Sequence, residues 1–265
     1  MKSRILVAVV GIPALVGIVL WAPAFVMAIA LCILAAVAAW ELLTCVGGEQ
    51  WELLALMGAV FAIFTVSWSR AVPPWVPALA ILEVLAVFSY AIVQAGAVKW
   101  EQIAAVLFSG LGIAWSFAAF LRMEAAGVRR GILLLPFLLS FACDTCAFFA
   151  GRAFGRRKLA PAVSPHKTVE GAVGGLAGAA LAGLLFALLA PGFRTPLWIL
   201  RMLLLSLLCG VVAQIGDLSF SLIKRQYGIK DYGRLFLEHG GVLDRFDSVL
   251  FVAPVVEWFL VNLPS

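Results

Sequence analysis

Residues 196–225 have the sequence PLWILRMLLLSLLCGVVAQIGDLSFSLIKR. Residues 196–222 are almost entirely apolar, and the run exceeds the roughly 20 residues that a helix needs to cross a membrane. In hydrocarbon the backbone must satisfy its own hydrogen bonds, so we expect this run to be helical. Asp217 and Ser221 interrupt it near one end, where an acid is costly unless it faces a polar cavity, a metal or a partner. The stretch therefore predicts a membrane helix that carries chemistry at one end.

The rest of the chain is of the same kind. Hydrophobic residues make up 64% of the 265 residues and charged residues 12%, about half the charged share of a soluble domain. Lipid must therefore be the solvent for most of the chain. We predict an all-α fold, a polytopic integral membrane helix bundle of about nine transmembrane helices. The expected spans are residues 5–20, 24–46, 52–69, 75–95, 101–121, 131–151, 170–190, 196–222 and 248–262.

Nine spans place the two long polar loops, 152–169 and 223–247, on one side of the membrane. Most of the 19 Lys and Arg residues fall on that same side, which the positive-inside rule makes cytoplasmic. We expect a cell inner (plasma) membrane protein with its active site on the cytoplasmic side. Residues 1–130 hold few polar groups within spans and no recognisable chemistry, so we expect them to serve packing, dimerisation or lipid access. Residues 131–265 form the expected catalytic region.

Two polar patches flank the loop 152–169. Asp144 lies about two turns before the end of its span, followed by Gly and Arg residues that could contact phosphate or simply form an interfacial end. Ser164 precedes Pro165, a pattern typical of a helix N-cap and first helical residue. Backbone amides there, together with Lys167 and a hydroxyl, would make a phosphate site. Plain helix capping is the alternative interpretation of the second patch.

The third and most informative patch runs from Gly216 to Ser248. On a helix, residues 217, 221, 224 and 225 would form one polar stripe. Asp244 and Asp247 are spaced i, i+3 and would share a helix face, and Gly240-Gly241 just before them permits a tight backbone approach. Carboxylates that face a shared cavity repel one another unless a cation neutralises them. Carboxylate and phosphate oxygens are the normal environment of Mg²⁺, so the patch favours a metal–polyphosphate site.

These residues resemble a known family. Ser221-x-x-Lys224-Arg225, Lys230-Asp231-x-Gly233 and His239-Gly240-Gly241-x-x-Asp244-Arg245-x-Asp247 together resemble the C-terminal motif of the phosphatidate cytidylyltransferases, the CDP-diacylglycerol synthases. The Asp144 and Ser164-Pro165 patches match two further family segments in the same order. The resemblance covers residues 140–250 in detail. The chain departs from the family pattern at His166, where a second Lys is usual, and at Leu237-Glu238, where Pro-Gly is usual.

The resemblance implies transfer of CMP from CTP to phosphatidic acid, giving CDP-diacylglycerol and pyrophosphate, with Mg²⁺ and a possible second cation. It implies Asp217 and Asp244 as metal ligands, aided catalytically by Asp144 and Asp247. It also implies a homodimer. The residues expected to bind substrate or order the loop are Ser164, Lys167, Ser221, Lys224, Arg225, Lys230, Asp231, His239 and Arg245.

Two other functions compete with this one. A CTP-dependent lipid kinase of the polyprenol-kinase type would share the metal and CTP chemistry but transfer the γ-phosphate to an alcohol. An ion-coupled transporter would also carry intramembrane acids, but here the charges gather at one end of the spans, and no inverted repeat is visible. No aromatic and basic pattern suits nucleic acid, so we expect no nucleic-acid partner.

Overall fold

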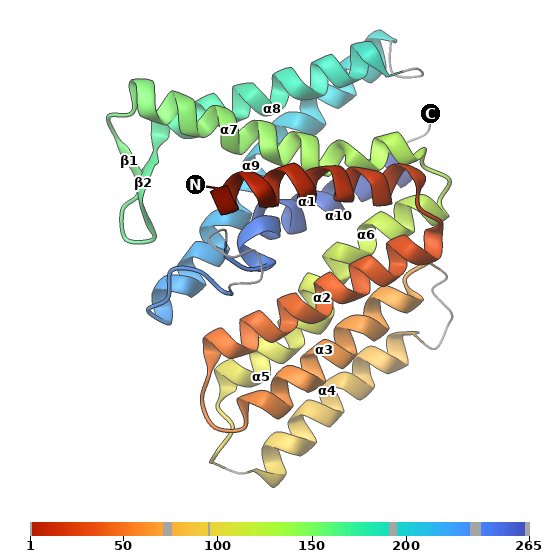
Figure 1. Cartoon of the computed structure of the whole chain (residues 1–265), viewed down its shortest axis with the longest axis vertical. Helices are drawn as coiled ribbons and strands as arrows, with labels where there is room; N and C mark the ends of the chain where they lie inside the picture. The colour runs from red at the N-terminus through yellow and green to blue at the C-terminus, as the bar shows by residue number, and fades with distance from the viewer. Residues whose placement is uncertain (1, 71–75, 95, 191–194, 234–239, 263–265) are drawn as a thin grey trace. The chain divides into compact units, whose positions relative to one another are not determined.

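A computed structural model of the chain describes residues 2–70, 76–94, 96–190, 195–233 and 240–262. Its described part is almost entirely helical, which confirms the all-α prediction (Figure 1). The elements are α1 (Lys2–Trp21), α2 (Ala24–Val46), α3 (Trp51–Trp68), α4 (Val76–Val93), α5 (Trp100–Leu107), the π-helix η1 (Phe108–Ile113), α6 (Ala114–Ala125), the 3-10 helix η2 (Arg130–Leu134), α7 (Leu135–Phe154), β1 (Lys158–Ala160), β2 (Ser164–Thr168), α8 (Val169–Leu189), α9 (Pro196–Gln226) and α10 (Leu243–Asn262).

Within the described residues, each of the nine apolar segments coincides with helical structure, and seven helical stretches are long and apolar enough to cross a membrane. The chain is therefore a multi-pass membrane protein. The full count of nine spans stays a prediction. The helix α10, which carries Asp244, Arg245, Asp247 and Glu257, is not one of these seven stretches. The seven stretches are Ala24–Val46, Trp51–Trp68, Val76–Val93, Trp100–Ala125, Arg130–Phe154, Val169–Leu189 and Pro196–Gln226.

The helices divide into two compact units. The first unit comprises residues 1–133 and 226–246, and the second comprises residues 134–225 and 247–265. In the first unit α2 packs along α3 (Figure 1). The contact is close because small residues line it: a Cβ added at Gly58 would lie 3.7 Å from the Cβ of Ala39. On α4, Ile81, Leu82 and Leu85 are exposed, as expected of a lipid-facing surface.

In the second unit α7 and α8 run alongside each other and make the most extensive helix pair there (Figure 1). Glycines on α8 allow this. A Cβ at Gly174 would overlap Ala150, and one at Gly178 would overlap Cys146. Such packing of small residues is the usual way in which membrane helices approach closely.

The helix α9 is a single continuous element of 31 residues, or about 46 Å at 1.5 Å per residue. That length exceeds the ~30 Å hydrocarbon core of a bilayer. The helix can therefore cross the membrane and still continue past it. Lys224 and Arg225 lie in its last turn, so the predicted stripe of Asp217, Ser221, Lys224 and Arg225 does lie on one helix.

The predicted helix start at Ser164 is wrong. Ser164–Thr168 is the strand β2, which pairs antiparallel with β1 through Lys158↔Thr168 and Ala160↔Ser164. The helix α8 begins only at Val169, because the β-branched Thr168 is its N-cap and accepts a hydrogen bond from Gly171 N at 3.1 Å. The Ser-Pro pattern is compatible with both structures, and strand pairing decides between them. Ser164 therefore does not offer the helix-end amides that were predicted to bind phosphate.

Candidate active site

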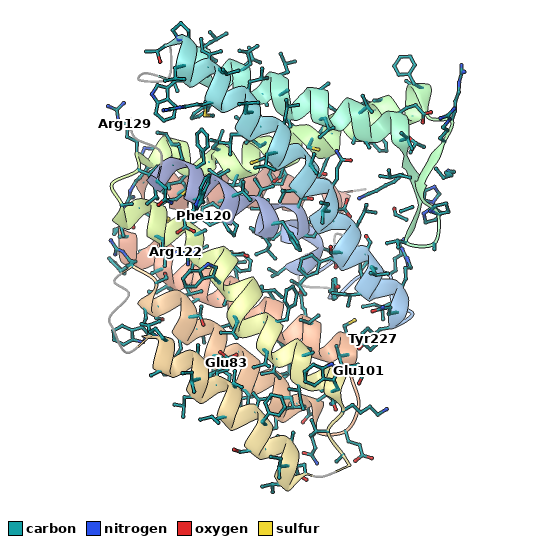
Figure 2. The ribbon with its side chains drawn as sticks, turned by 180° about the vertical axis from the view of Figure 1, so that it is seen from behind. Glu83, Glu101, Phe120, Arg122, Arg129 and Tyr227 are labelled. Carbon is teal, nitrogen blue, oxygen red and sulfur yellow. The ribbon has the colours of Figure 1, made fainter. Side chains whose placement is uncertain are left out.

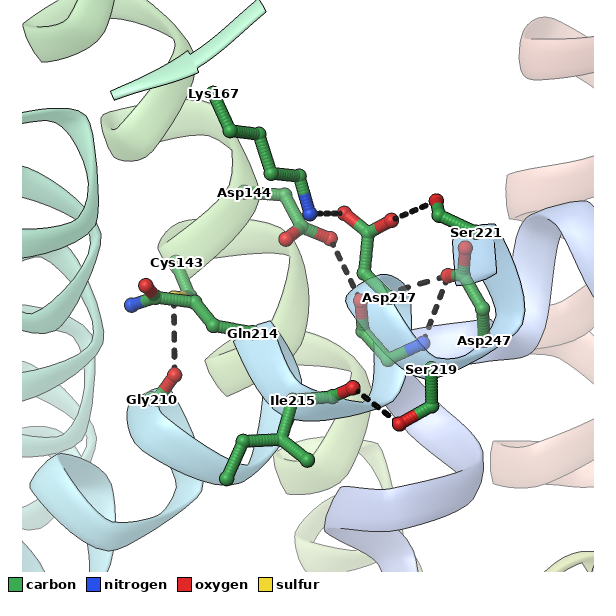
Figure 3. Close-up of polar contacts among 11 residues, drawn as sticks. Cys143, Asp144, Lys167, Gly210, Gln214, Ile215, Asp217, Ser219, Ser221 and Asp247 are labelled. Carbon is green, nitrogen blue, oxygen red and sulfur yellow. Dashed lines mark hydrogen bonds and ion pairs between the residues drawn. The ribbon is translucent and has the colours of Figure 1, made fainter. Parts of the chain in front are cut away.

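Three aspartates of the second unit lie close together, and one of them pairs with a lysine (Figure 3). They are Asp144 on α7, Asp217 on α9 and Asp247 on α10. The ammonium of Lys167, on β2, forms an ion pair and hydrogen bond with Asp217 Oδ2. Both side chains of this pair are about one quarter exposed, at 28% and 25%. The pair is thus partly shielded from water but still reachable by a solute.

A single hydroxyl connects the other two aspartates. Ser248 Oγ lies 3.3 Å from Asp144 Oδ2 and 3.4 Å from Asp247 Oδ1. A hydroxyl has one proton, so Ser248 donates to one of these carboxylates at a time. Asp247 Oδ1 also accepts from the backbone N of Ser248 at 2.7 Å. Asp217 is close enough to Asp144 and Asp247 for their charges to interact. The structure thus brings all three predicted acids of this unit together.

The stripe on α9 contacts both the cluster and the hairpin. Ser221 Oγ donates to Asp217 Oδ1 at 3.3 Å. One turn later, Arg225 Nε donates to the carbonyl of Val163 at 3.2 Å, which ties the turn between β1 and β2 to the end of α9. Lys224 is buried, with 9% of its surface exposed. Four of the predicted substrate-binding or catalytic side chains therefore do share a helix face.

Gly216 explains how α10 approaches the cluster. A Cβ at this position would lie 2.8 Å from the carbonyl oxygen of Asp247 and 2.9 Å from the ring of Phe251. Only glycine leaves room for the α10 backbone at this point, and the residue that follows it is Asp217. The Gly-Asp pair therefore combines a close helix contact with a carboxylate next to that contact.

Asp244 belongs to the first unit, where it holds a turn. Its Oδ2 accepts from the backbone N of Tyr232 at 2.7 Å and of Gly241 at 2.9 Å. Gly240 has a φ of +80°, and a Cβ there would lie 2.6 Å from Asp244 Oδ2. The prediction that Gly240-Gly241 allows a tight backbone approach is confirmed. The predicted pairing of Asp244 with Asp217 takes one residue from each unit and stays a prediction.

Glu41 was missed by the sequence analysis. It lies on α2, in the half of the chain that was predicted to hold no recognisable chemistry, and is 6% exposed. Its two carboxylate oxygens accept from the backbone N of Val242 at 2.9 Å and of Leu243 at 3.0 Å. The available signal was the position itself: an acid near the end of an apolar span is costly unless it has partners.

A second carboxylate occupies the segment where a phosphate contact was considered. Glu170 Oε2 accepts from Arg156 N at 3.0 Å and from Arg157 N at 3.2 Å. These two backbone amides at the end of α7 therefore already have an acceptor within the chain. Among the other predicted residues, Lys230, Asp231 and Arg245 are exposed and belong to the first unit. His239, Leu237 and Glu238 lie outside the described residues.

The acids and hydroxyls present suit a hard cation. Within the described residues, no group of three or more His, Cys, Asp or Glu side chains is arranged to hold a metal ion by itself. Mg²⁺ does not require one, because it is usually held by one or two carboxylates together with substrate phosphates and water. The oxygen donors around Asp217, and the basic side chains beside them, fit a cation that arrives with a polyphosphate.

Comparisons with known proteins match nearly the whole chain. The model of the family described as "Cytidylyltransferase family" matches residues 2–263. A protein of Staphylococcus haemolyticus named phosphatidate cytidylyltransferase is 30% identical over 99% of this chain and 100% of its own length. A protein of the same name from Staphylococcus epidermidis is 31% identical over 99% of this chain and 100% of its own length. Another from Bacillus subtilis is 33% identical over 71% of this chain and 68% of its own length.

Proposed function

The chain belongs to the cytidylyltransferase family, and we propose that it transfers CMP from CTP to phosphatidic acid, releasing pyrophosphate and forming CDP-diacylglycerol. The observation that carries the proposal is the cluster of Asp144, Asp217 and Asp247 on apolar helices, with Lys167 paired to Asp217. Its mixed charge suits an anionic, metal-bound nucleotide, and its setting among apolar helices suits a lipid co-substrate.

The reaction forms a bond between a lipid phosphate oxygen and the α-phosphorus of CTP, and it breaks the α–β phosphoanhydride bond. The lipid phosphate is already anionic at neutral pH, so no strong general base is needed. The work of the protein is to bring two anions together and to stabilise the charge that develops on the leaving pyrophosphate. Lys167 forms an ion pair with Asp217, and we assign it to a phosphate of CTP.

Lys167 has a partner that it can exchange. In the structure its ammonium pairs with Asp217, and a triphosphate would compete for that ammonium with more acceptor oxygens. Release of Lys167 would leave Asp217 with an oxygen for a cation. Ser221, which donates to the other oxygen of Asp217, would keep the carboxylate oriented during the exchange. Ser164, Lys224, Arg225 and Lys230 remain further candidates for phosphate binding, with Asp231, His239 and Arg245 ordering the loop.

We propose Asp217 and Asp244 as the ligands of Mg²⁺, on the basis of the motif, with Asp144 and Asp247 in supporting roles or at a second cation. When bound, Mg²⁺ would neutralise the triphosphate and stabilise the leaving pyrophosphate. Asp244 suits a ligand role because two backbone amides fix its Oδ2. Asp217 suits it because its partners are side chains that can move.

We further propose that the protein lies in the inner (plasma) membrane as a homodimer with this site on the cytoplasmic side. The charge asymmetry of the loops supports the orientation, since Lys and Arg concentrate on the side of the loops 152–169 and 223–247. Apolar side chains exposed on α7, such as Phe148 and Phe149 at 60% and 63%, would face acyl chains while the phosphate of the lipid stays at the interface.

Two labels on CTP test the reaction. Purified protein is incubated with phosphatidic acid, Mg²⁺ and CTP labelled either at the α- or at the γ-phosphate. We expect the α-label in a lipid product and the γ-label in pyrophosphate. A lipid kinase would instead move the γ-label to lipid when given a polyprenol. Folded protein that transfers neither label to lipid would overturn the proposed function.

The Asp217 cluster is tested with a pair of neighbouring serines on α9. Ser221→Ala removes the hydroxyl that donates to Asp217, and we expect slower turnover. Ser219→Ala is the matched control, because the Ser219 hydroxyl donates to the carbonyl of Ile215 in its own helix at 2.7 Å. The control should keep the activity of the unmodified protein. Equal turnover in both variants would contradict the placement of the site at Asp217.

A further inference from the structure

The first turn of α10 needs acceptors that its own sequence does not supply. The first amides of any helix have no partner within it, and they are usually capped by an oxygen of a Ser, Thr, Asp or Asn side chain at the N-cap. Here the carbonyl of Val242 accepts the first helical bonds, from Arg245 N at 3.0 Å and Phe246 N at 3.1 Å. Val242 is fully buried at 0% exposure, and its side chain has no oxygen. The cap must therefore come from elsewhere in the fold.

Glu41 supplies that cap from a helix some 200 positions earlier in the chain. One carboxylate oxygen accepts from Val242 N at 2.9 Å and the other from Leu243 N at 3.0 Å. The side chain is only 6% exposed. A negative charge at a helix N-terminus is also favoured by the helix dipole. Both oxygens of this buried acid thus accept a hydrogen bond from a backbone amide of the first unit.

The glycines of the motif leave space for this carboxylate. A Cβ at Gly241 would overlap the Glu41 carboxylate, and one at Gly233 would lie 2.5 Å from Glu41 Oε1. The φ of Gly241 is not positive, so its backbone conformation would accept alanine. The close approach of Glu41, rather than backbone strain, explains why position 241 is glycine.

The turn that Glu41 holds is the turn that orients Asp244. Gly241 N donates to Asp244 Oδ2, and the next two amides donate to Glu41. We propose that Glu41 is a positioning residue for catalysis: by capping α10 from α2, it fixes residues 240–243 and with them the direction of the Asp244 carboxylate. The inference rests on the proposed function, in which Asp244 is a metal ligand.

The chemistry of the contact predicts which substitutions fail. Each Glu41 oxygen accepts one N–H, whereas Gln offers one acceptor oxygen and one NH₂ group that would face an N–H donor. Glu41→Gln therefore removes one bond at nearly constant size. Glu41→Asp keeps both acceptors but shortens the side chain by one methylene, so it should restore part of the function. Loss in the Gln variant with partial recovery in the Asp variant would identify the acceptor pair as the cause.

Glu83 offers a matched control within the same unit (Figure 2). It is equally buried, at 2% exposure, but its Oε1 has no hydrogen-bond partner among the described residues. We expect Glu41→Gln to lower kcat by about 10- to 100-fold, as removal of partners that orient a metal ligand usually does, and to raise the Mg²⁺ concentration needed for half activity. The KM for phosphatidic acid should stay unchanged. Glu83→Gln should keep the kcat and Mg²⁺ requirement of the unmodified protein.

Hydrogen exchange tests the cap without any assay of turnover. Amides of residues 241–243 should exchange faster in Glu41→Gln than in the unmodified protein or in Glu83→Gln. Gly241→Ala, which displaces the same carboxylate from the other side, should have the same effect. If Glu41→Gln folds poorly, the Gly241→Ala variant carries both measurements.

The outcomes separate the two hypotheses. If the unmodified protein makes no CDP-lipid, the proposed function fails, while faster exchange in Glu41→Gln would still support the cap. If the unmodified protein is active and Glu41→Gln matches Glu83→Gln in kcat, Mg²⁺ requirement and exchange, the inference about Glu41 is overturned. A loss of folded protein with an unchanged kcat per folded molecule would show a merely structural role and would also overturn it.

Discussion

In the first unit, the carboxylates of Glu41 and Asp244 are held by backbone amides, each of which has a fixed place in a turn or helix end. In the second unit, the carboxylate of Asp217 is held instead by the ammonium of Lys167 and a serine hydroxyl. Backbone amides cannot leave without unfolding a segment, whereas long side chains can rotate away. The carboxylates of Glu41 and Asp244 are thus fixed, whereas that of Asp217 has partners that it can exchange.

This difference suits the two tasks of a nucleotidyltransferase site. A fixed carboxylate presents an oxygen in one direction and keeps a loop in place for each catalytic cycle. An exchangeable carboxylate can give up a cationic partner when a cation and a polyphosphate arrive. The contrast assigns different consequences to substitutions that look alike in sequence, and the following experiments test it, beginning with the largest expected effect.

Asp217→Asn and Asp244→Asn should separate chemistry from folding. Both should lower kcat by more than about 100-fold, since even residues that only orient a ligand contribute ~10–100-fold. Asp217→Asn should leave the thermal unfolding midpoint nearly unchanged, because its partners are side chains that water can solvate. Asp244→Asn should also lower the midpoint, because Tyr232 N and Gly241 N both donate to Oδ2 and a neutral amide oxygen accepts more weakly than a carboxylate. Similar midpoints in the two variants would break the contrast between fixed and exchangeable carboxylates.

Lys167→Ala and Arg130→Ala should show the same contrast in basic residues. Lys167→Ala removes the partner of Asp217, and we expect about a 10- to 100-fold lower kcat/KM for CTP. Arg130 bonds Glu124 at 2.8 Å and the carbonyl of Ala22, so Arg130→Ala should reduce stability with little change in turnover. Lys167→Arg, which keeps the charge, should recover part of the activity. Turnover unaffected by Lys167→Ala would remove this residue from the site.

The fold was largely predictable because the bilayer makes backbone hydrogen bonding and segment length dominate. In the part of the chain that the structure describes, all nine predicted segments coincide with helices, and the turn between the first two contains Pro23, the residue before α2. The hairpin β1–β2 was not predictable from Ser164-Pro165, since the same pair is compatible with a helix start. Its pairing depends on residues 158–160, which carry no strong strand pattern.

The acids of the second unit could be predicted because each interrupts an apolar run or belongs to a dense motif. Asp144 and Asp217 stand out for the first reason, and Asp247 for the second. Glu41 also interrupts an apolar run, but its role could not be predicted, because its partners are backbone amides some 200 positions away and a backbone amide leaves no trace in a sequence. Lys167 was predicted to bind phosphate. Its pairing with Asp217 was not predicted, because it depends on the position of strand β2, which precedes α8.

Helix packing behind the cluster should have a moderate effect that acts through stability. Gly178→Ala would overlap Cys146 across the α7–α8 contact, and overpacking of this kind costs about 1–3 kcal/mol. Gly131→Ala, at a position with nothing within 4 Å of the added Cβ, is the matched control and should be neutral. Unfolding in dodecylmaltoside micelles, followed by near-UV circular dichroism, measures both. A neutral Gly178→Ala would show that α7 and α8 are not held together by small residues.

Arg70→Ala should have the smallest effect on the free energy of unfolding. The size of this effect tests whether an ion pair of the first unit contributes to stability only where it is shielded from water. Arg70 lies 3.5 Å from Glu124, but its side chain is 42% exposed, so the pair should contribute less than about 1 kcal/mol and be weakened further by salt. Arg130, which bonds the same carboxylate at 2.8 Å and is 32% exposed, should contribute more because it also bonds a backbone carbonyl. The double variant should lose more stability than the sum of the two single variants, since Glu124, with 12% exposure, would then be left without either guanidinium. If the losses in unfolding free energy of the two single variants add up to that of the double variant, the two arginines act on Glu124 independently. The expected effect of the shared, shielded carboxylate would then be contradicted.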